Sequence, residues 1–511
     1  METSLPFAPA FEVFAARWWQ GRSSAVVARR VCDLETPVSL LLKLGRGRPH
    51  TFLLESVEGG ETRGRYSILG RAPDLLWRCI EGRAERVHLD PEGRVTSVAP
   101  ETLPPMESLE SLLATCRLDA PDLPAPVAAG LFGYLGYDLV SQMERVPALP
   151  PSDVDVPEAL LMRPRIVAIL DHVEDVLTLV TPAWFDAAQS AEGAYDAACA
   201  RLSEALSDLD QRPCRAVAAL TTSPPASRTP SPTPAARSAL TPEAFKANVD
   251  RAKAYIRAGD IFQVVLSQRF ERPFSASPLA LYRTVRRIEP SPFLFFFDFG
   301  AFSVVGSSPE VLVRLRDGVV TIRPIAGTRP RGQGNRSDAE LEEELLADPK
   351  ERAEHLMLLD LGRNDVGRVA AKGTVRVTAQ NTIERYHHVM HIVSNVEGDL
   401  EPSRTALDAL RAGFPAGTVS GAPKIRAMQI IAEMEPQRRG VYAGALGYFG
   451  ADGSLDTCIA IRTGVVKDGM LYVQAGAGIV YDSDPETEHR ECLAKARGLL
   501  QAAALTEDEG P

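Results

Sequence analysis

The chain has 511 residues, of which 45% are hydrophobic and 24% are charged, and its formal net charge is −11. This composition is typical of a globular protein with a large core. The acidic balance argues against nucleic acid as the main partner, because phosphate binding requires a basic surface. No apolar run is long enough to span a membrane, and the N-terminus lacks a signal-peptide pattern. The seven cysteines form no C-x-x-C pair, so we expect a cytoplasmic protein with reduced thiols and no membrane contact.

A segment rich in Pro, Ser and Thr divides the chain into two parts. It reads TTSPPASRTPSPTPAARS from residue 221. Such a composition cannot bury a core and predicts a linker. We therefore expect an N-terminal region at 1–220, a linker at 221–239 and a second domain at 240–511.

The elements of the second domain begin with a helix that Thr241 caps and Gly259 ends. The β-branched run at 261–270 predicts a strand. Residues 303–328 predict further strands, with a hairpin turn at Asp317-Gly318.

Three more helices follow in the second domain. The first starts at Asp348-Pro349, has Glu351 in a capping-box position and is expected to end at Gly362. The second follows Pro423, and the last runs from Asp484 to about Leu505. Successive strands with interspersed helices, without strict βαβ alternation, predict an α+β fold with large antiparallel or mixed sheets.

A glycine-rich loop, FPAGTVSGAPKIRAM, covers 414–428. It is not a P-loop, because Lys424 lies three residues beyond Gly421. The amides before the next helix and the hydroxyl of Thr418 could hold a carboxylate or a phosphate. A glycine-rich loop that only caps a helix is the alternative, and the loop taken alone favours it.

Carboxylates recur on two predicted helices. Glu488, Glu491 and Lys495 fall on one face of the last helix, and Glu354 could add a third carboxylate from the helix after Asp348. Mg²⁺ binds to one or two carboxylates, with waters and substrate oxygens completing its shell. A solvated helix face is the alternative.

Two further side chains could transfer protons. Glu310 follows a turn in SSPE, where burial would raise its pKa and suit a general acid. His391 shares a predicted strand face with Val389 and could act as an acid or base. A strand-end glutamate and a core histidine are the alternatives. The small-residue segments PIAGT (324–328) and QAGAGIV (474–480) would admit a flat ligand, and Arg462 could pair with its carboxylate.

Together these motifs resemble the chorismate-utilising enzymes, and within that family the anthranilate synthase component I branch. The resemblance covers essentially all of 240–505 and rests on PIAGTRPRG, EHLMLLDLGRNDVGRVA, VMHIVSNVEG, GTVSGAPKIRAM, LDTCIAIRT and QAGAGIV. It implies a fold in which two large antiparallel or mixed sheets sandwich helices (β/α/α/β). It also implies that the bound anion is the dicarboxylate chorismate.

The resemblance implies a role for each matched residue. Glu354 and Glu491, with Glu488 close by, are expected to hold Mg²⁺. Glu310 is expected to protonate the departing 4-hydroxyl, and His391 to serve the elimination of pyruvate. The expected substrate-binding residues are Thr328, Thr418, Tyr442, Arg462, Gly476, Gly478 and Lys495.

Two positions distinguish branches of the family. In isochorismate and salicylate synthases a lysine activates water at the position that Gln263 occupies here. In many aminodeoxychorismate synthases a lysine that attacks the ring stands at the position of Ala326. Gln263 favours ammonia over water as the nucleophile, and Ala326 disfavours the para isomer without excluding relatives that lack this lysine. The resemblance thus implies that chorismate and ammonia give anthranilate and pyruvate, the first step of tryptophan biosynthesis. Three alternatives stay open: aminodeoxychorismate synthase component I, an enzyme that stops at the aminodeoxyisochorismate intermediate, and a non-catalytic regulator.

The ammonia source and the effector site are also implied by the resemblance. No cysteine has the G-x-C-x-G context of a glutaminase nucleophile, so we expect a separate glutamine amidotransferase subunit and a hetero-oligomer. FLLES (52–56) and EPSPFLFF (289–296) resemble the family's tryptophan-binding elements, although the second usually has Asn and Tyr where this chain has Glu289 and Phe293. The expected effector residues for feedback inhibition are Glu55, Ser56, Pro292, Phe293 and Leu294; a buried strand end is the alternative.

Overall fold

The computed structural model describes residues 7–58, 62–118, 129–211, 236–332, 336–386 and 389–508. The α-helices are α1 (Phe11–Trp18), α2 (Pro37–Gly45), α3 (Pro105–Thr115), α4 (Val140–Met143), α5 (Ala191–Asp210), α7 (Pro242–Arg257), α8 (Pro278–Ile288), α9 (Asp338–Ala347), α10 (Pro349–Gly367), α11 (Ala406–Gly413), α12 (Lys424–Met434) and α13 (Pro485–Asp508).

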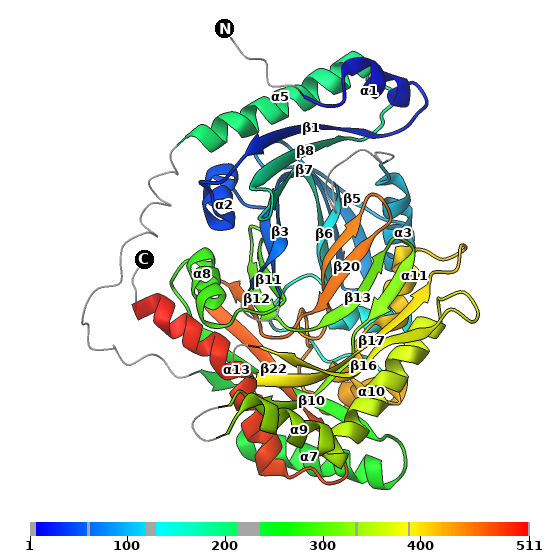
Figure 1. Cartoon of the computed structure of the whole chain (residues 1–511), viewed down its shortest axis with the longest axis vertical. Coiled ribbons are helices and arrows are strands. Elements are labelled where there is room, and N and C mark those ends of the chain that lie inside the picture. Colours follow the sequence, from blue (N-terminus) through cyan, green and yellow to red (C-terminus); the bar gives the residue numbers. More distant parts are fainter. Residues whose placement is uncertain are drawn as a thin grey trace.

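The strands form antiparallel pairs that join into one network within the described residues. They are β1 (Ser24–Val31), β2 (Thr51–Glu58), β3 (Thr62–Ile80), β4 (Arg83–Leu89), β5 (Val95–Pro100), β6 (Gly130–Leu135), β7 (Ala159–Asp171), β8 (Val176–Ala183), β9 (Arg237–Ser238), β10 (Gln263–Pro273), β11 (Phe293–Asp298), β12 (Ser303–Ser308), β13 (Val311–Arg316), β14 (Val319–Ile322), β15 (Ile325–Pro330), β16 (Arg376–Arg385), β17 (Val389–Asp399), β18 (Gly421–Ala422), β19 (Ala445–Gly450), β20 (Leu455–Ile459), β21 (Thr463–Lys467) and β22 (Met470–Ile479). Figure 1 shows α1 and α5 packed beside β1 and β8 at one end of the molecule, and α10 and α13 beside β17 and β22 towards the other. The α+β prediction is confirmed.

Strands from before and after the predicted linker pair with one another. In β2–β11, Leu54 is opposite Phe295, and in β6–β19, Tyr134 is opposite Leu446. The buried apolar clusters likewise combine side chains from both parts of the chain. Most of the predicted linker lies outside the described residues, and its last part forms β9, which pairs with β10. The two predicted parts therefore share sheet and core, while the domain boundaries themselves stay a prediction.

Local signals placed several elements of the second part correctly. The Thr241 side chain accepts a hydrogen bond from the amide of Ala244 and caps α7. The turn at Asp317-Gly318 joins β13 to β14, with positive φ at both residues as a tight hairpin requires. The helices expected after Pro423 and after Asp484 are α12 and α13.

The predicted end of α10 at Gly362 is wrong. The helix continues to Gly367, and a Cβ at Gly362 would lie 3.1 Å from Pro324. This glycine thus permits close packing inside the helix rather than ending it. Asp348 caps α10 as expected, but the Glu351 carboxylate pairs with Arg329 (3.2 Å) instead of completing a capping box.

No helix in the described ranges is both long and apolar enough to cross a membrane. The cytoplasmic location inferred from the sequence stays a prediction.

Candidate active site

A cavity of about 580 Å³ lies where β10, β15, β17 and β22 meet α10 and α13. Its volume is in the usual range for small-molecule sites. Every residue predicted for catalysis, substrate binding or metal binding lines this cavity: Glu310, His391, Thr328, Thr418, Tyr442, Arg462, Gly476, Gly478, Lys495, Glu354, Glu488 and Glu491.

Glu310 follows β12 and is half-buried in the cavity wall. The hydroxyl of Thr418 donates a hydrogen bond to its Oε2 (2.8 Å). Burial raises the pKa of Glu310, against the opposite effects of the Thr418 hydrogen bond and of the nearby Lys495 and Arg462 charges. A raised pKa favours the protonated carboxyl, the form that a general acid needs.

His391 projects from β17 into the same cavity. Its Nδ1 lies 3.0 Å from the carbonyl oxygen of Gly327 and 3.1 Å from Oγ1 of Thr328. Because a carbonyl only accepts, the neutral ring carries its proton on Nδ1, and Nε2 is left as the acceptor. Burial lowers the pKa of His391, and the Arg462 charge acts in the same direction. The ring is therefore a candidate base.

The carboxylates of Glu354 on α10 and of Glu488 and Glu491 on α13 face one cavity. Burial raises the pKa of Glu354, and the nearby Glu351 and Glu491 carboxylates act in the same direction. Burial likewise raises the pKa of Glu488, and Glu491 again adds repulsion. A divalent cation would offset this repulsion, so the donor set fits the hard cation that the sequence predicts.

The carboxylates do not form a complete metal cage. Across the described ranges, no group of three or more His, Cys, Asp or Glu side chains converges closely enough to hold a metal ion. Glu491 instead pairs with Lys495 (2.7 Å). Mg²⁺ typically takes only one or two protein carboxylates and completes its shell with waters and substrate oxygens. Magnesium binding accordingly stays a prediction.

The same cavity also offers groups for an anion. Arg462 adopts a left-handed backbone conformation (φ 51°), which is strained for a residue other than glycine. Lys495 Nζ donates to the carbonyl of Gly476 (3.0 Å). A Cβ at Gly476 would lie 2.8 Å from the Tyr442 hydroxyl, and one at Gly478 only 2.6 Å from the Gln263 side chain. Glycine at these two positions therefore leaves open space in the cavity beside the polar ends of Tyr442 and Gln263.

The glycine-rich loop contributes less to the cavity than its sequence suggests. Only Thr418 and Val419 of this loop line it. Gly421 and Ala422 form β18, which pairs with β10, and Lys424 forms a buried ion pair with Asp365 (2.7 Å). An anion site at the start of the following helix gains no support from this cavity, because Gly421, Ala422 and Lys424 do not line it.

Sequence reasoning missed several lining residues. Lys350 and Glu351 lie one helical turn before Glu354 on α10. Gln474 shares the face of β22 that carries Gly476 and Gly478, and Val480 directly follows that strand. The helical and strand periodicities could have identified all four. Gln263, noted only as a substitute for a lysine, also lines the cavity, and its Oε1 has no hydrogen-bond partner among the described residues.

A second cavity, of about 800 Å³, contains all five predicted effector residues: Glu55, Ser56, Pro292, Phe293 and Leu294. The Glu55 carboxylate already accepts a hydrogen bond from the hydroxyl of Tyr282. It also accepts two hydrogen bonds from the guanidinium of Arg286, of 2.6 and 2.8 Å. Its charge is therefore neutralised inside the protein, so it is not free for a ligand. Pro309 and Ile325 line both cavities, which makes the two cavities neighbours.

A family model described as chorismate binding enzyme matches residues 72–501. The chain belongs to the chorismate binding enzymes. Anthranilate synthase component 1 of Cereibacter sphaeroides is 54% identical over 504 residues, which cover 98% of each chain. The crystal structure of anthranilate synthase component I from Streptococcus pneumoniae is 36% identical, has a TM-score of 0.72, and is matched over 85% of this chain and 92% of that chain.

A more distant neighbour shares only the fold. The menaquinone-specific isochorismate synthase of Escherichia coli is 19% identical, with a TM-score of 0.66 over 97% of this chain and 99% of that chain. The resemblance and fold class inferred from the motifs are confirmed, and so is the expectation that this family member is an enzyme.

Proposed function

We propose that the chain is the chorismate-converting component of an anthranilate synthase, which combines chorismate with ammonia and releases anthranilate and pyruvate. The observation that carries this proposal is the convergence of all twelve motif-derived residues on one cavity. The relatives named anthranilate synthase component 1 support it, because they match the chain almost end to end.

The cavity has a group for each step. Ammonia adds to the ring, and Glu310 gives its proton to the 4-hydroxyl, which leaves as water. His391 then serves the elimination of pyruvate, with Nε2 as the acceptor and Nδ1 held by Gly327. Arg462 and Tyr442, which line the same cavity, bind the enolpyruvyl carboxylate. Glu354, Glu488 and Glu491 would hold Mg²⁺, which when bound polarises and orients the ring carboxylate.

The choice of nucleophile rests on two lining residues. Gln263 and Ala326 both line the cavity, at the positions where related enzymes with other nucleophiles have lysine. Neither side chain can activate water as a base or attack the ring as an amine. Gln263 therefore supports ammonia over water as the nucleophile, and Ala326 disfavours the para-aminated product.

Two finer parts of the proposal concern partners and regulation. Ammonia would come from a glutamine amidotransferase subunit, a component II that complements the component 1 of the relatives' names. Tryptophan would bind in the second cavity and inhibit the enzyme, a regulation that suits the first step of tryptophan synthesis. Because Glu55 is already paired, backbone carbonyls near Ser56 would receive the amino group of tryptophan.

The deciding experiment uses the purified chain with chorismate, Mg²⁺ and an ammonium salt at mildly alkaline pH. Anthranilate fluorescence is followed and the product is identified by chromatography. We expect anthranilate, loss of the signal with EDTA, and inhibition by tryptophan. Chorismate consumption without anthranilate would favour the para-aminated product or a stalled intermediate. No consumption at all would contradict an enzymatic role in this reaction, and activity unchanged by tryptophan would remove only the effector site.

A further inference from the structure

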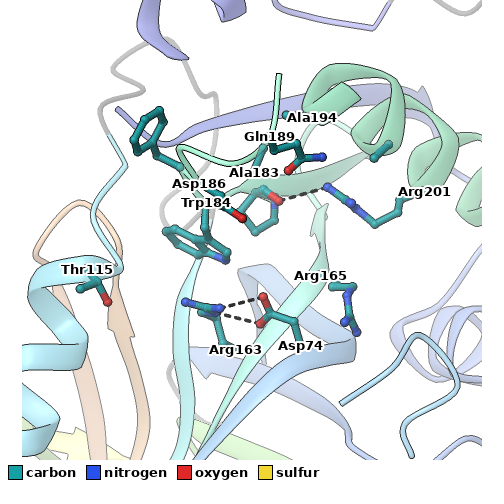
Figure 2. Close-up of a pocket in the computed structure, with 13 residues that line it drawn as sticks. Asp74, Thr115, Arg163, Arg165, Ala183, Trp184, Asp186, Gln189, Ala194 and Arg201 are labelled. Carbon is teal, nitrogen blue, oxygen red and sulfur yellow. Dashed lines mark hydrogen bonds and ion pairs between the residues drawn. The ribbon is translucent and has the colours of Figure 1, made fainter. Parts of the chain in front are cut away.

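A third pocket, of about 400 Å³, lies between β3, β7, β8 and α5 and shares no lining residue with the two cavities described above. Figure 2 shows Trp184 next to Arg163 on the left, Arg165 and Arg201 on the right, and Asp74 between Arg163 and Arg165. No motif of the proposed reaction falls in this pocket, so the reaction does not explain its charges.

Within the described part of the chain, only one of the three arginines has a carboxylate partner. Arg163 binds Asp74 through two hydrogen bonds of 2.8 Å, and its guanidinium lies 5.2 Å from the centre of the Trp184 ring. Arg165 and Arg201 form no ion pair within the described residues. Both remain charged, because guanidinium does not lose its proton in proteins.

The partners of Arg165 and Arg201 are neutral. Arg165 donates to the backbone carbonyls of four residues, which are Ala72, Pro73, Leu89 and Asp90. Arg201 donates from Nε to Thr181 Oγ1 (2.8 Å) and from Nη2 to the carbonyl of Pro182 (3.3 Å). Its Nη1 has no hydrogen-bond partner among the described residues, so the guanidinium keeps unused donors.

The surroundings compensate these positive charges only in part. Burial lowers the pKa of Arg165, and the Arg163 charge acts in the same direction, whereas the Asp74, Asp90 and Glu92 carboxylates act in the opposite one. Burial also lowers the pKa of Arg201, with repulsion from Arg165 and an opposite effect of Asp74. Asp186 also lines the pocket but is exposed, and its carboxylate accepts a hydrogen bond from the amide of Ala188. Partly buried cations that are not paired directly with a carboxylate are costly, and an anion in the pocket would compensate the remaining positive charge.

The shape and lining indicate the kind of anion. A planar guanidinium with free donors matches a carboxylate or phosphate. Trp184 and the exposed ring of Phe185 offer a flat apolar surface beside these donors. We propose that this arginine pocket (Arg163, Arg165, Arg201 and Trp184) binds a small metabolite, whose carboxylate or phosphate lies beside Arg201 and whose planar part lies against Trp184. This site goes beyond the proposed reaction.

The test uses the full chain labelled with 5-fluorotryptophan, whose four tryptophans give separate ¹⁹F signals. The Trp184→Phe variant assigns the pocket signal. Inorganic phosphate and benzoate are titrated separately, with chloride keeping the ionic strength constant. We expect a saturable shift of the Trp184 signal, and Arg201→Met should raise the half-saturating concentration at least about tenfold.

Controls separate binding from folding. Arg201→Met must retain the thermal unfolding profile of the parent chain; if it does not, Arg201→Lys, which keeps the charge but not the planar fork, should still weaken binding. Arg411→Met, which removes an exposed arginine on α11, should leave the titration unchanged. A response to phosphate alone would identify a phosphorylated ligand, and a response to benzoate alone a carboxylate. No saturable shift with either anion, or equal shifts with and without Arg201, would overturn the proposal.

Discussion

Glu310 is the residue whose replacement tests the proposed chemistry most directly. Glutamine keeps the size of the side chain and can still accept the Thr418 hydrogen bond, but it cannot supply a proton. We expect Glu310→Gln to bind chorismate normally in the presence of Mg²⁺ and to turn over at least about a hundredfold more slowly. Steady-state kinetics and equilibrium binding check this, with the exposed Glu433→Gln on α12 as the matched control. Near-normal turnover would remove Glu310 from the acid role.

The His391 side chain allows a prediction of how the proposed reaction depends on pH. Its pKa lies below the ordinary value of 6.5 because the ring is buried near the Arg462 charge. The base form is neutral above the pKa, so the contribution of His391 should persist through pH 6.5 and disappear only as the pH falls further. An NMR titration of the imidazole carbons, with His391→Asn to assign the signal, measures this midpoint. A midpoint above 6.5 would contradict the inference.

Arg439 connects elements rather than touching the cavity. Its buried guanidinium donates to the carbonyls of Val265 on β10 and Val419 in the glycine-rich loop (both 2.7 Å), and it lies 5.6 Å from the centre of the Tyr442 ring. Val265, Val419 and Tyr442 all line the active-site cavity. One side chain thus fixes three walls of the site, while the Glu435 carboxylate balances its charge (2.6 and 2.8 Å).

Replacing Arg439 should lower the free energy of unfolding. Arg439→Met would leave the Glu435 carboxylate buried without its partner, and we expect a loss of about 3–5 kcal/mol in unfolding free energy. The double variant Glu435→Gln with Arg439→Met should recover part of that loss, because no unpaired charge remains. Denaturant unfolding of the single and double variants measures both effects. Equal midpoints for parent and Arg439→Met would show that the pair does not contribute to stability.

The whole molecule depends on pairing between its two halves. β11 lies between β2 and β12, and β19 lies between β6 and β20, so each half supplies neighbours for central strands of the other. A protease site engineered between residues 221 and 230 should therefore yield fragments that co-elute and keep their activity. Residues 240–511 expressed alone should aggregate, because β11 and β19 would each expose an unpaired edge. Gel filtration and turnover measurements check this; fragments that separate after cleavage would contradict it.

The amino-acid sequence by itself determined the local elements and the members of the site. Caps, turn residues and strand alternation placed α7, the hairpin at Asp317-Gly318 and α13, because these signals act between residues close in the chain. The motifs identified twelve of the residues that line the cavity, but not their neighbours Lys350 and Glu351.

Only the tertiary structure decided which groups were already engaged and which remained available. Lys424 is paired with Asp365, and Glu55 with Arg286, so neither is free for a ligand. The continuation of α10 through Gly362, the pairing of strands across the two halves and the arginine pocket also depend on residues far apart in the sequence. The physical reason is that burial and charge pairing are set by the three-dimensional neighbours of a side chain, which local sequence patterns do not specify.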